Sequence, residues 1–141
     1  MKLILISILV FFSFQLKSQE ISLFNLNGKA VAYVDTDDDD LTIYLWGGKP
    51  VAYISDGNIY GFNGKHLGWW VKGIIRNHDG DVIGATKEAT NMPTEFEPFK
   101  SFKEFRPFKS LKEFAPFFKP FWSNSWSSES FKMFLLEGIS D

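Results

Sequence analysis

Four glycine-containing turn signals, placed at nearly regular intervals, constrain the fold of this 141-residue chain more than any other feature. The turn pairs are Asn27-Gly28, Gly47-Gly48, Asn63-Gly64 and Asp79-Gly80, and their second residues are spaced by 20, 16 and 16 residues. Each pair is preferred in the two-residue type I′ turn, in which both residues take positive φ and two antiparallel strands are joined. The sequence therefore predicts four tandem β-hairpins within residues 21–86.

A two-residue turn also predicts which residues pair across each hairpin. On one face, every copy places an aliphatic side chain opposite a residue with a small side chain or none. These pairs are Leu23/Ala32, Ile43/Ala52, Ile59/Gly68 and Ile75/Gly84. A single hairpin is marginally stable in water, so we expect the four to form one unit with the aliphatic side chains around a shared centre. Nearer the turns, the same register predicts the pairs Phe24/Val31, Tyr44/Val51, Tyr60/Leu67 and Arg76/Ile83.

The repeated phrase, [IL]-[YF]-x-x-[NG]-G-K-x-[VL]-[AG]-[YW], resembles the bacterial four-fold beta flower proteins. The resemblance covers about residues 21–86, and the Phe-, Pro- and Lys-rich sequence that follows is also similar. It implies an all-β fold of four hairpins in a pseudo-four-fold arrangement, and it implies no catalytic residues. The fourth copy has Arg76, His78, Asp81 and Ala85 where the pattern has Tyr or Phe, an aromatic residue, Lys, and Tyr or Trp. A site built from four equivalent positions would be incomplete there.

The chain begins with a segment that is not expected to belong to the fold. Lys2 precedes an apolar run from Leu3 to Phe14, which is shorter than a membrane-spanning helix and typical of a signal peptide at residues 1–18. Ser18 is suited to cleavage, so we expect an exported mature chain without a transmembrane segment. An uncleaved membrane anchor is the alternative.

Three further segments follow. Residues 19–91 are predicted to form the four-hairpin β module, 92–126 an extended Phe/Lys/Pro-rich tail, and 127–141 a short C-terminal helix. Ser127 or Ser128 is the expected cap of that helix, and Gly138 its end.

The tail has a three-residue period. Phe recurs at every third position from Phe96 to Phe108, Lys or Arg follows at a constant offset, and proline recurs every nine residues. This period matches polyproline II, whereas short helical turns broken at each proline are the alternative. Two hypotheses remain for the Phe ridge. It folds back across the aromatic face of the hairpins, or it binds a partner, a membrane surface or a second copy.

Composition and motifs exclude several function classes. A net charge of −2 argues against a nucleic-acid partner, and the absence of cysteine excludes disulfides. No sequence motif for a serine hydrolase, a zinc protease or a phosphate-binding loop is present, so we predict a non-catalytic protein without a cofactor. The alternative is an envelope hydrolase that uses carboxylates and His78, with Asp79 as its neighbour. The repeat does not relate His66 to His78, so they are not expected to pair.

The remaining candidate sites are binding sites. Aromatic rings at one repeated position, with lysines beside the turns, are typical of surfaces that stack on sugars or cations. These residues are Tyr33, Tyr53 and Trp69, with Lys29, Lys49 and Lys65. The acidic stretch at 35–40 makes Asp37 and Asp39 weak candidates for metal binding, but it lacks the glycine and glutamate of a calcium loop. A solvated acidic connection is therefore the preferred interpretation.

Together these features predict a binding or structural module of the bacterial cell envelope, periplasmic, cell-surface or secreted. Its partner would be an envelope glycan or a protein. A protein–protein adaptor that acts through the Phe/Lys tail is the further alternative.

Overall fold

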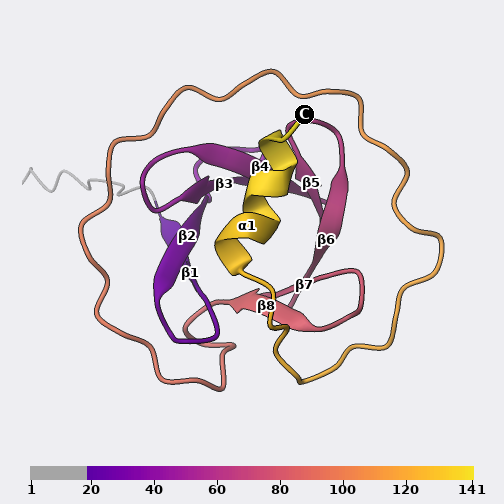
Figure 1. The fold of residues 1–141 in the computed structure, drawn as a ribbon. Coiled ribbons are helices and arrows are strands. Elements are labelled where there is room, and N and C mark those ends of the chain that lie inside the picture. Colours follow the sequence, from indigo (N-terminus) through magenta and orange to yellow (C-terminus); the bar gives the residue numbers. More distant parts are fainter. Residues whose placement is uncertain (1–18) are drawn as a thin grey trace, which may run out of the picture.

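The fold is a closed barrel of eight antiparallel strands, with one hairpin forming each quarter (Figure 1). The computed structural model describes residues 19–141, so the predicted signal peptide lies outside the described residues. The strands are β1 (Glu20–Phe24), β2 (Ala30–Asp35), β3 (Thr42–Leu45), β4 (Pro50–Ser55), β5 (Asn58–Gly61), β6 (His66–Val71), β7 (Ile74–Arg76) and β8 (Val82–Ala85). Each strand pairs with its neighbours in chain order, and β8 closes the barrel on β1. The predicted all-β fold of four hairpins is confirmed.

The hairpin turns differ from the predicted type I′ geometry. Only the second residue of each turn pair has positive φ, as at Gly28 with φ of 76°. The Gly28 amide donates to the Asn25 carbonyl, and the turn is followed by a bulge, so Phe24 pairs with Ala30 instead of Val31. The other hairpins shift in the same way and pair Tyr44 with Pro50, Tyr60 with His66 and Arg76 with Val82.

Two-residue turns of the predicted kind occur between the hairpins. Asp56 and Gly57 have φ of 52° and 76°, and Lys72 and Gly73 have φ of 51° and 83°. They join β4 to β5 and β6 to β7. These pairs lie outside the repeated phrase, so the repeat gives no signal for them.

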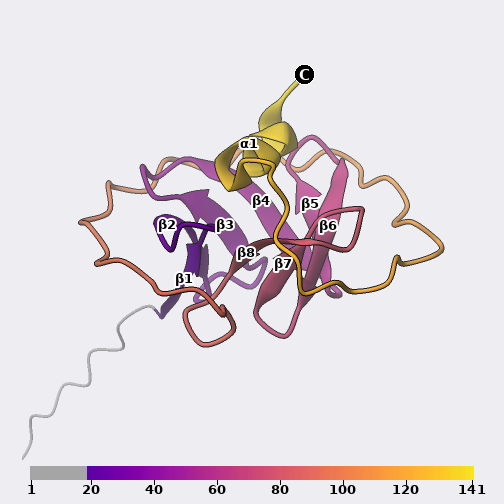
Figure 2. The same cartoon turned by 60° about the horizontal axis from the view of Figure 1, so that its bottom comes forward.

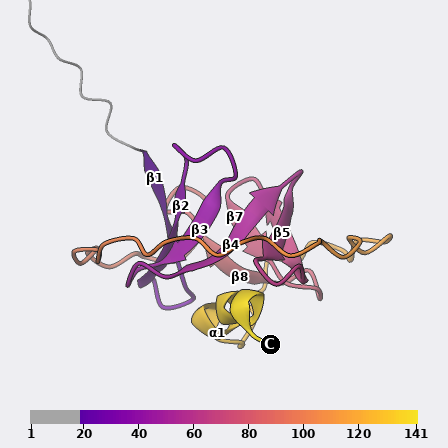
Figure 3. The same cartoon turned by 90° about the horizontal axis from the view of Figure 1, so that it is seen from above.

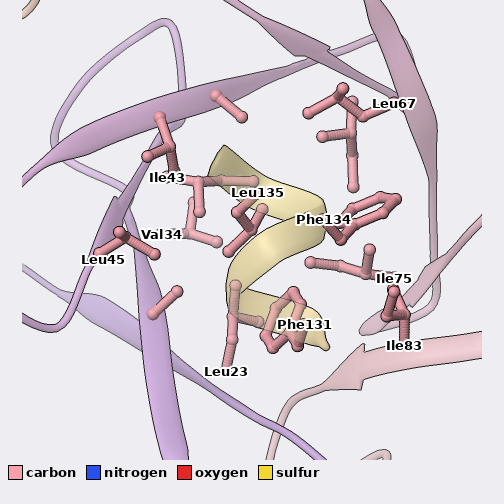
Figure 4. Close-up of a cluster of buried hydrophobic side chains, with 14 of the residues drawn as sticks. Leu23, Val34, Ile43, Leu45, Leu67, Ile75, Ile83, Phe131, Phe134 and Leu135 are labelled. Carbon is pink, nitrogen blue, oxygen red and sulfur yellow. The ribbon is translucent and has the colours of Figure 1, made fainter. Parts of the chain in front are cut away.

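The barrel interior matches the predicted pairing away from the turns. Leu23 pairs with Ala32, Ile43 with Ala52, Ile59 with Gly68 and Ile75 with Gly84. The four aliphatic side chains are fully buried in one cluster (Figure 4). The shared centre expected from the sequence is therefore present.

A short helix closes one end of this centre. The helix α1 (Phe131–Leu136) lies over the mouth of the barrel and inserts Phe131, Phe134 and Leu135 among the aliphatic side chains (Figures 1 and 4). Gly84 leaves room for it, because a Cβ there would lie 2.6 Å from Cε2 of Phe131. The small residues opposite the aliphatic ones thus make space for the helix as well as for neighbouring strands.

Two predicted details of the helix are wrong. Its cap is Ser130, whose side chain accepts from the Met133 amide, and not Ser127 or Ser128. The Ser127 amide donates to the Val82 carbonyl, so the chain is still attached to the barrel there. Gly138 does not end the helix either, because the 3-10 helix η2 (Glu137–Ile139) continues through it.

The packing predicts that Gly68→Ala destabilises the barrel. A Cβ at this position would overlap the backbone carbonyl oxygen of Arg76 and lie 3.2 Å from Cζ of Phe134, so strand and helix would both have to move. We expect the free energy of unfolding to fall by about 1–3 kcal/mol in urea titrations. Gly47→Ala is the control, because nothing lies within 4 Å of its Cβ position, and it should change that free energy by less than about 0.5 kcal/mol. Equal stabilities of the two variants would contradict this packing.

Candidate functional site

The tail, residues 92–126, runs around the outside of the barrel in one plane (Figures 1 and 3). It forms no helix, which contradicts the alternative of broken helical turns. Its backbone amides donate to carbonyls of the four hairpin turns. These bonds are Glu95 to Gly28 at 2.8 Å, Glu104 to Gly48 at 2.9 Å, Glu113 to Gly64 at 3.0 Å and Ser123 to Gly80 at 3.1 Å. The nine-residue spacing of the three glutamates therefore matches one quarter of the barrel.

The second glycine of each turn is required by this contact as well as by its positive φ. A Cβ at Gly48 would overlap the carbonyl oxygen of Phe102. The other three turns are arranged in the same way, with Gly28 against Pro93, Gly64 against Leu111 and Gly80 against Phe121. The bare backbone of the turns thus lets the tail approach at four points and fixes which side of it faces the barrel.

The inward side of the tail carries the cations from Lys100 to Lys112. Lysine ammonium groups lie over tyrosine rings on the outer face of the barrel, at distances typical of cation–π contacts. The Nζ-to-centroid distances are 4.8 Å for Lys100 and Tyr33, 5.5 Å for Lys103 and Tyr44, 4.3 Å for Lys109 and Tyr53, and 5.4 Å for Lys112 and Tyr60. The tail does cover the aromatic face, as one hypothesis expected, but it does so with lysine.

The same cations pair with the acidic stretch and with β1. Lys100 Nζ lies 2.7 Å from Glu20 Oε1, and Lys109 Nζ lies 2.8 Å from Asp40 Oδ1. Lys103 binds Asp35, and Arg106 binds Asp38. The acidic connection is therefore an attachment surface for the tail, a role that the sequence analysis did not assign to it.

The candidate metal ligands of this stretch are not gathered into a site. Asp37 and Asp39 lie exposed on the connection between β2 and β3. Within residues 19–141, no three His, Cys, Asp or Glu side chains are grouped closely enough to hold a metal ion.

Ionisation states in this contact reinforce the pairing. Burial disfavours the Glu20 carboxylate, but hydrogen bonds from Lys100 and Lys103 outweigh it and lower its pKa. Burial also disfavours the Lys103 ammonium, but the hydrogen bonds that it donates to Asp35 and Glu20 outweigh burial and raise its pKa. Both partners therefore stay charged across the neutral pH range.

Because the cations face inward, the phenylalanine side chains of the tail and Leu111 face outward. We call these residues the phenylalanine belt, and each is at least 81% exposed. The belt comprises Phe96, Phe99, Phe102, Phe105, Phe108, Leu111, Phe114, Phe117, Phe118 and Phe121. The hypothesis that the Phe ridge is buried on the barrel is wrong, since lysine takes the inward third of the three-residue period.

The fourth quarter reverses the contact. The barrel supplies the cation, Arg76, and the tail supplies the ring, Trp122, with the guanidinium carbon 5.4 Å from the ring centroid. The Arg76 guanidinium also donates to the carbonyls of Gly80 and Ser123. The departure of the fourth copy from the repeat pattern therefore has a structural reason.

The predicted ligand-binding rings are covered. Tyr33, Tyr53 and Trp69 are no more than 3% exposed, beneath the tail, and so are not available for stacking on a sugar. The lysines named with them, Lys29, Lys49 and Lys65, are exposed at the hairpin turns. The structure does not bring the six residues together into one open site.

The two histidines form a pair that the repeat did not indicate. His66 Nδ1 lies 2.9 Å from His78 Nε2, with the rings stacked, and His66 Nε2 lies 3.0 Å from Asn58 Oδ1. The bulge before His66 moves it to the outer face of the barrel beside His78, whereas the predicted two-residue turn would have placed His66 on the inner face.

The other predicted neighbour of His78 is not hydrogen-bonded to its ring. Asp79 is a turn residue, and among residues 19–141 no carboxylate is hydrogen-bonded to either histidine ring. Burial, and after it the neighbouring His78, lowers the pKa of His66 to about 4.

The tail almost completes a circle. It leaves β8, crosses to the first hairpin and returns to the fourth, where Trp126 is bridged to Val82 (Figure 2). The Trp126 indole also donates to the Asn91 side chain at 3.1 Å, which joins the end of the tail to the residue just before it.

Comparisons with known proteins identify a family. A family model described as "4-fold beta flower protein" matches residues 21–135, which include the barrel, the whole tail and most of α1. No curated protein and no solved structure matches the chain.

The close contact at the turns predicts that Gly48→Ala loosens the tail. The methyl group would displace the Phe102 carbonyl, so the tail should be cut faster by trypsin at the nearby cations. Gly57→Ala is the matched control, because Gly57 also has positive φ but the nearest atom to its Cβ position is 3.8 Å away. It should share the backbone strain and keep the cleavage rate of the wild type. Similar rates in both variants would mean that the tail is not held by this contact.

The histidine pair predicts a loss of stability in mild acid. As pH falls from 7 to 5, the unfolded chain binds a proton at His66, with an ordinary pKa of 6.5, while the folded chain keeps this ring neutral. The free energy of unfolding should fall by about 1–2 kcal/mol over this range. His66→Gln should lack this part of the pH dependence, which urea titrations at pH 7 and pH 5 would measure. An identical slope in variant and wild type would refute the assignment.

Proposed function

The chain belongs to the 4-fold beta flower family, and we propose that it is a non-catalytic binding module of the bacterial cell envelope that docks to a partner protein through the phenylalanine belt. The observation that carries this proposal is the near-complete exposure of ten large apolar side chains on one continuous segment. Soluble monomers rarely expose apolar patches of more than a few hundred Å² unless the patch binds something.

The belt is also held in a fixed shape. Backbone hydrogen bonds to all four hairpin turns and ion pairs to the acidic connection attach the tail along its length. A partner would meet side chains whose backbone is already ordered, so little conformational entropy is lost on binding. Outward Phe and inward Lys thus favour the adaptor hypothesis over a tail that merely covers the barrel.

The other candidate functions have less support. A hydrolase would need an acid–base group near a carboxylate, and the hydrogen-bond partner of His78 is the His66 ring. A glycan site at Tyr33 and Tyr53 would need the tail to leave.

The proposed export to the envelope rests on the apolar N-terminal segment. Within residues 19–141, no helix has the length and apolar character needed to cross a bilayer.

The proposal predicts that the triple variant Phe99→Ser/Phe108→Ser/Phe117→Ser loses its partner without losing its fold. These rings are at least 91% exposed, so their removal should leave the free energy of unfolding within about 0.5 kcal/mol of the wild type. The measurement is retention of the full-length protein on the envelope fraction of the cells that produce it, after a salt wash. We expect the wild type to remain with the fraction and the triple variant to be released.

The matched control is Lys29→Ser/Lys49→Ser/Lys65→Ser, which changes three exposed residues at the turns. It should be retained like the wild type. Retention of the belt variant, or release of the lysine variant alone, would overturn docking through the belt.

A further inference from the structure

We propose that the partner of the phenylalanine belt is a closed protein collar, that is, a ring or tube with an apolar bore that surrounds this chain. This inference rests on the proposed docking through the belt and specifies the shape of the partner. It follows from where the belt residues lie, from how much surface they carry, and from the charges on either side of them.

The belt faces outward in nearly every direction within its plane. The tail contacts the turns of all four hairpins in succession, and the hairpins are the four quarters of the barrel. Seen edge-on, it stays in one plane around the barrel wall, with α1 on one side of that plane (Figure 3). A single globular partner on one side would leave most of the belt in water.

The area of the belt gives the same result. An aromatic side chain carries about 150–250 Å² of surface, so one quarter with three belt residues offers roughly 450–750 Å². Standard protein interfaces bury about 800 Å² on each partner. The nine phenylalanines together offer roughly 1,350–2,250 Å², which exceeds that size. Only a partner that encloses the barrel can bury the whole belt.

A lipid bilayer does not fit the belt. The strands have at most six residues, so the barrel wall is no taller than about 20 Å, whereas the hydrocarbon core of a bilayer is about 30 Å thick. Exposed charges lie at both ends of the barrel, with Lys29 and Lys49 at the hairpin turns and Asp37 and Asp39 on the connection between β2 and β3 at the opposite end. Hydrocarbon on all sides of the belt would also surround these charges, at a large cost in free energy. A protein bore can place polar groups opposite them.

A second copy of this chain does not fit either. Two convex rims touch along a short line, and a stack of copies leaves both belts exposed. The tail instead repeats one unit, E-F-x-P-F-K-S-[FL]-K, beginning at Glu95 and Glu104, with a divergent copy from Glu113. Similar units on successive quarters are what a collar of identical subunits would recognise.

Site-specific photo-cross-linking tests the collar. The photoreactive analogue p-benzoylphenylalanine replaces Phe99, Phe108 or Phe117, one in each arc between neighbouring turn contacts, in the full-length protein within its own cells. Lys87, exposed on the connection after β8, is the control position. The collar predicts that one partner forms an adduct of the same mass at all three belt positions. It predicts no such adduct at the control position, Lys87. The native mass of the purified complex should equal the mass of one copy of this chain plus that of the ring or tube formed by the cross-linked partner.

The other outcomes overturn the collar. An adduct at only one or two neighbouring positions indicates a one-sided partner, an adduct of twice the chain mass indicates a second copy, and adducts with lipid indicate a membrane. The one-sided result would leave the proposed docking to a protein in place. Absence of any adduct also overturns the collar, and retention of the belt variant on the envelope fraction would then show that the proposed function itself has failed.

Discussion

The contact between the tail backbone and the four turn glycines determines the rest of the surface. An extended chain with a three-residue period presents one third of its side chains inward, and the hydrogen bonds at Gly28, Gly48, Gly64 and Gly80 fix which third that is. The inward third is lysine and arginine, which meet tyrosine rings and carboxylates. The outward third is then phenylalanine. The exposed apolar rim is therefore a direct consequence of backbone register and is maintained by charge.

Much of the barrel followed from the sequence because it depends on local rules. Turn glycines and the alternation of Ile with Ala or Gly identified the hairpins and the aliphatic centre from Leu23 to Ile75. The pairs next to the turns were wrong by one residue, because Asn-Gly and Asp-Gly also suit a longer turn with a bulge, and only the geometry distinguishes the two. That single shift explains why the contact of His66 with His78 was missed.

The tail could be predicted only in part, since its contacts join residues far apart in the sequence. The segregation of acid at 35–40 from base at 100–112 was visible, and so was the nine-residue period. If each nine-residue repeat of the tail is assigned to one 16-residue hairpin repeat, the tail aligns with the four turns. This alignment would have directed the lysine side chains toward Tyr33 and Tyr53. Burial preference alone pointed the other way, because it assigns phenylalanine to the interior. Here the barrel already had a complete interior, filled by the aliphatic side chains and α1.

The barrel has one weak junction. Seven of its strand pairs are formed by several residues, but β8 joins β1 only through Ala85 and Phe24. The tail crosses this junction at once, and its far end returns to the same place, where Trp126 meets Asn91. The tail therefore encircles the barrel, and its two ends meet beside the junction between β8 and β1. During synthesis the first hairpins emerge long before residue 126. The hairpins are therefore present before the tail can be attached around them, and the two ends of the tail meet only when almost the whole chain is available.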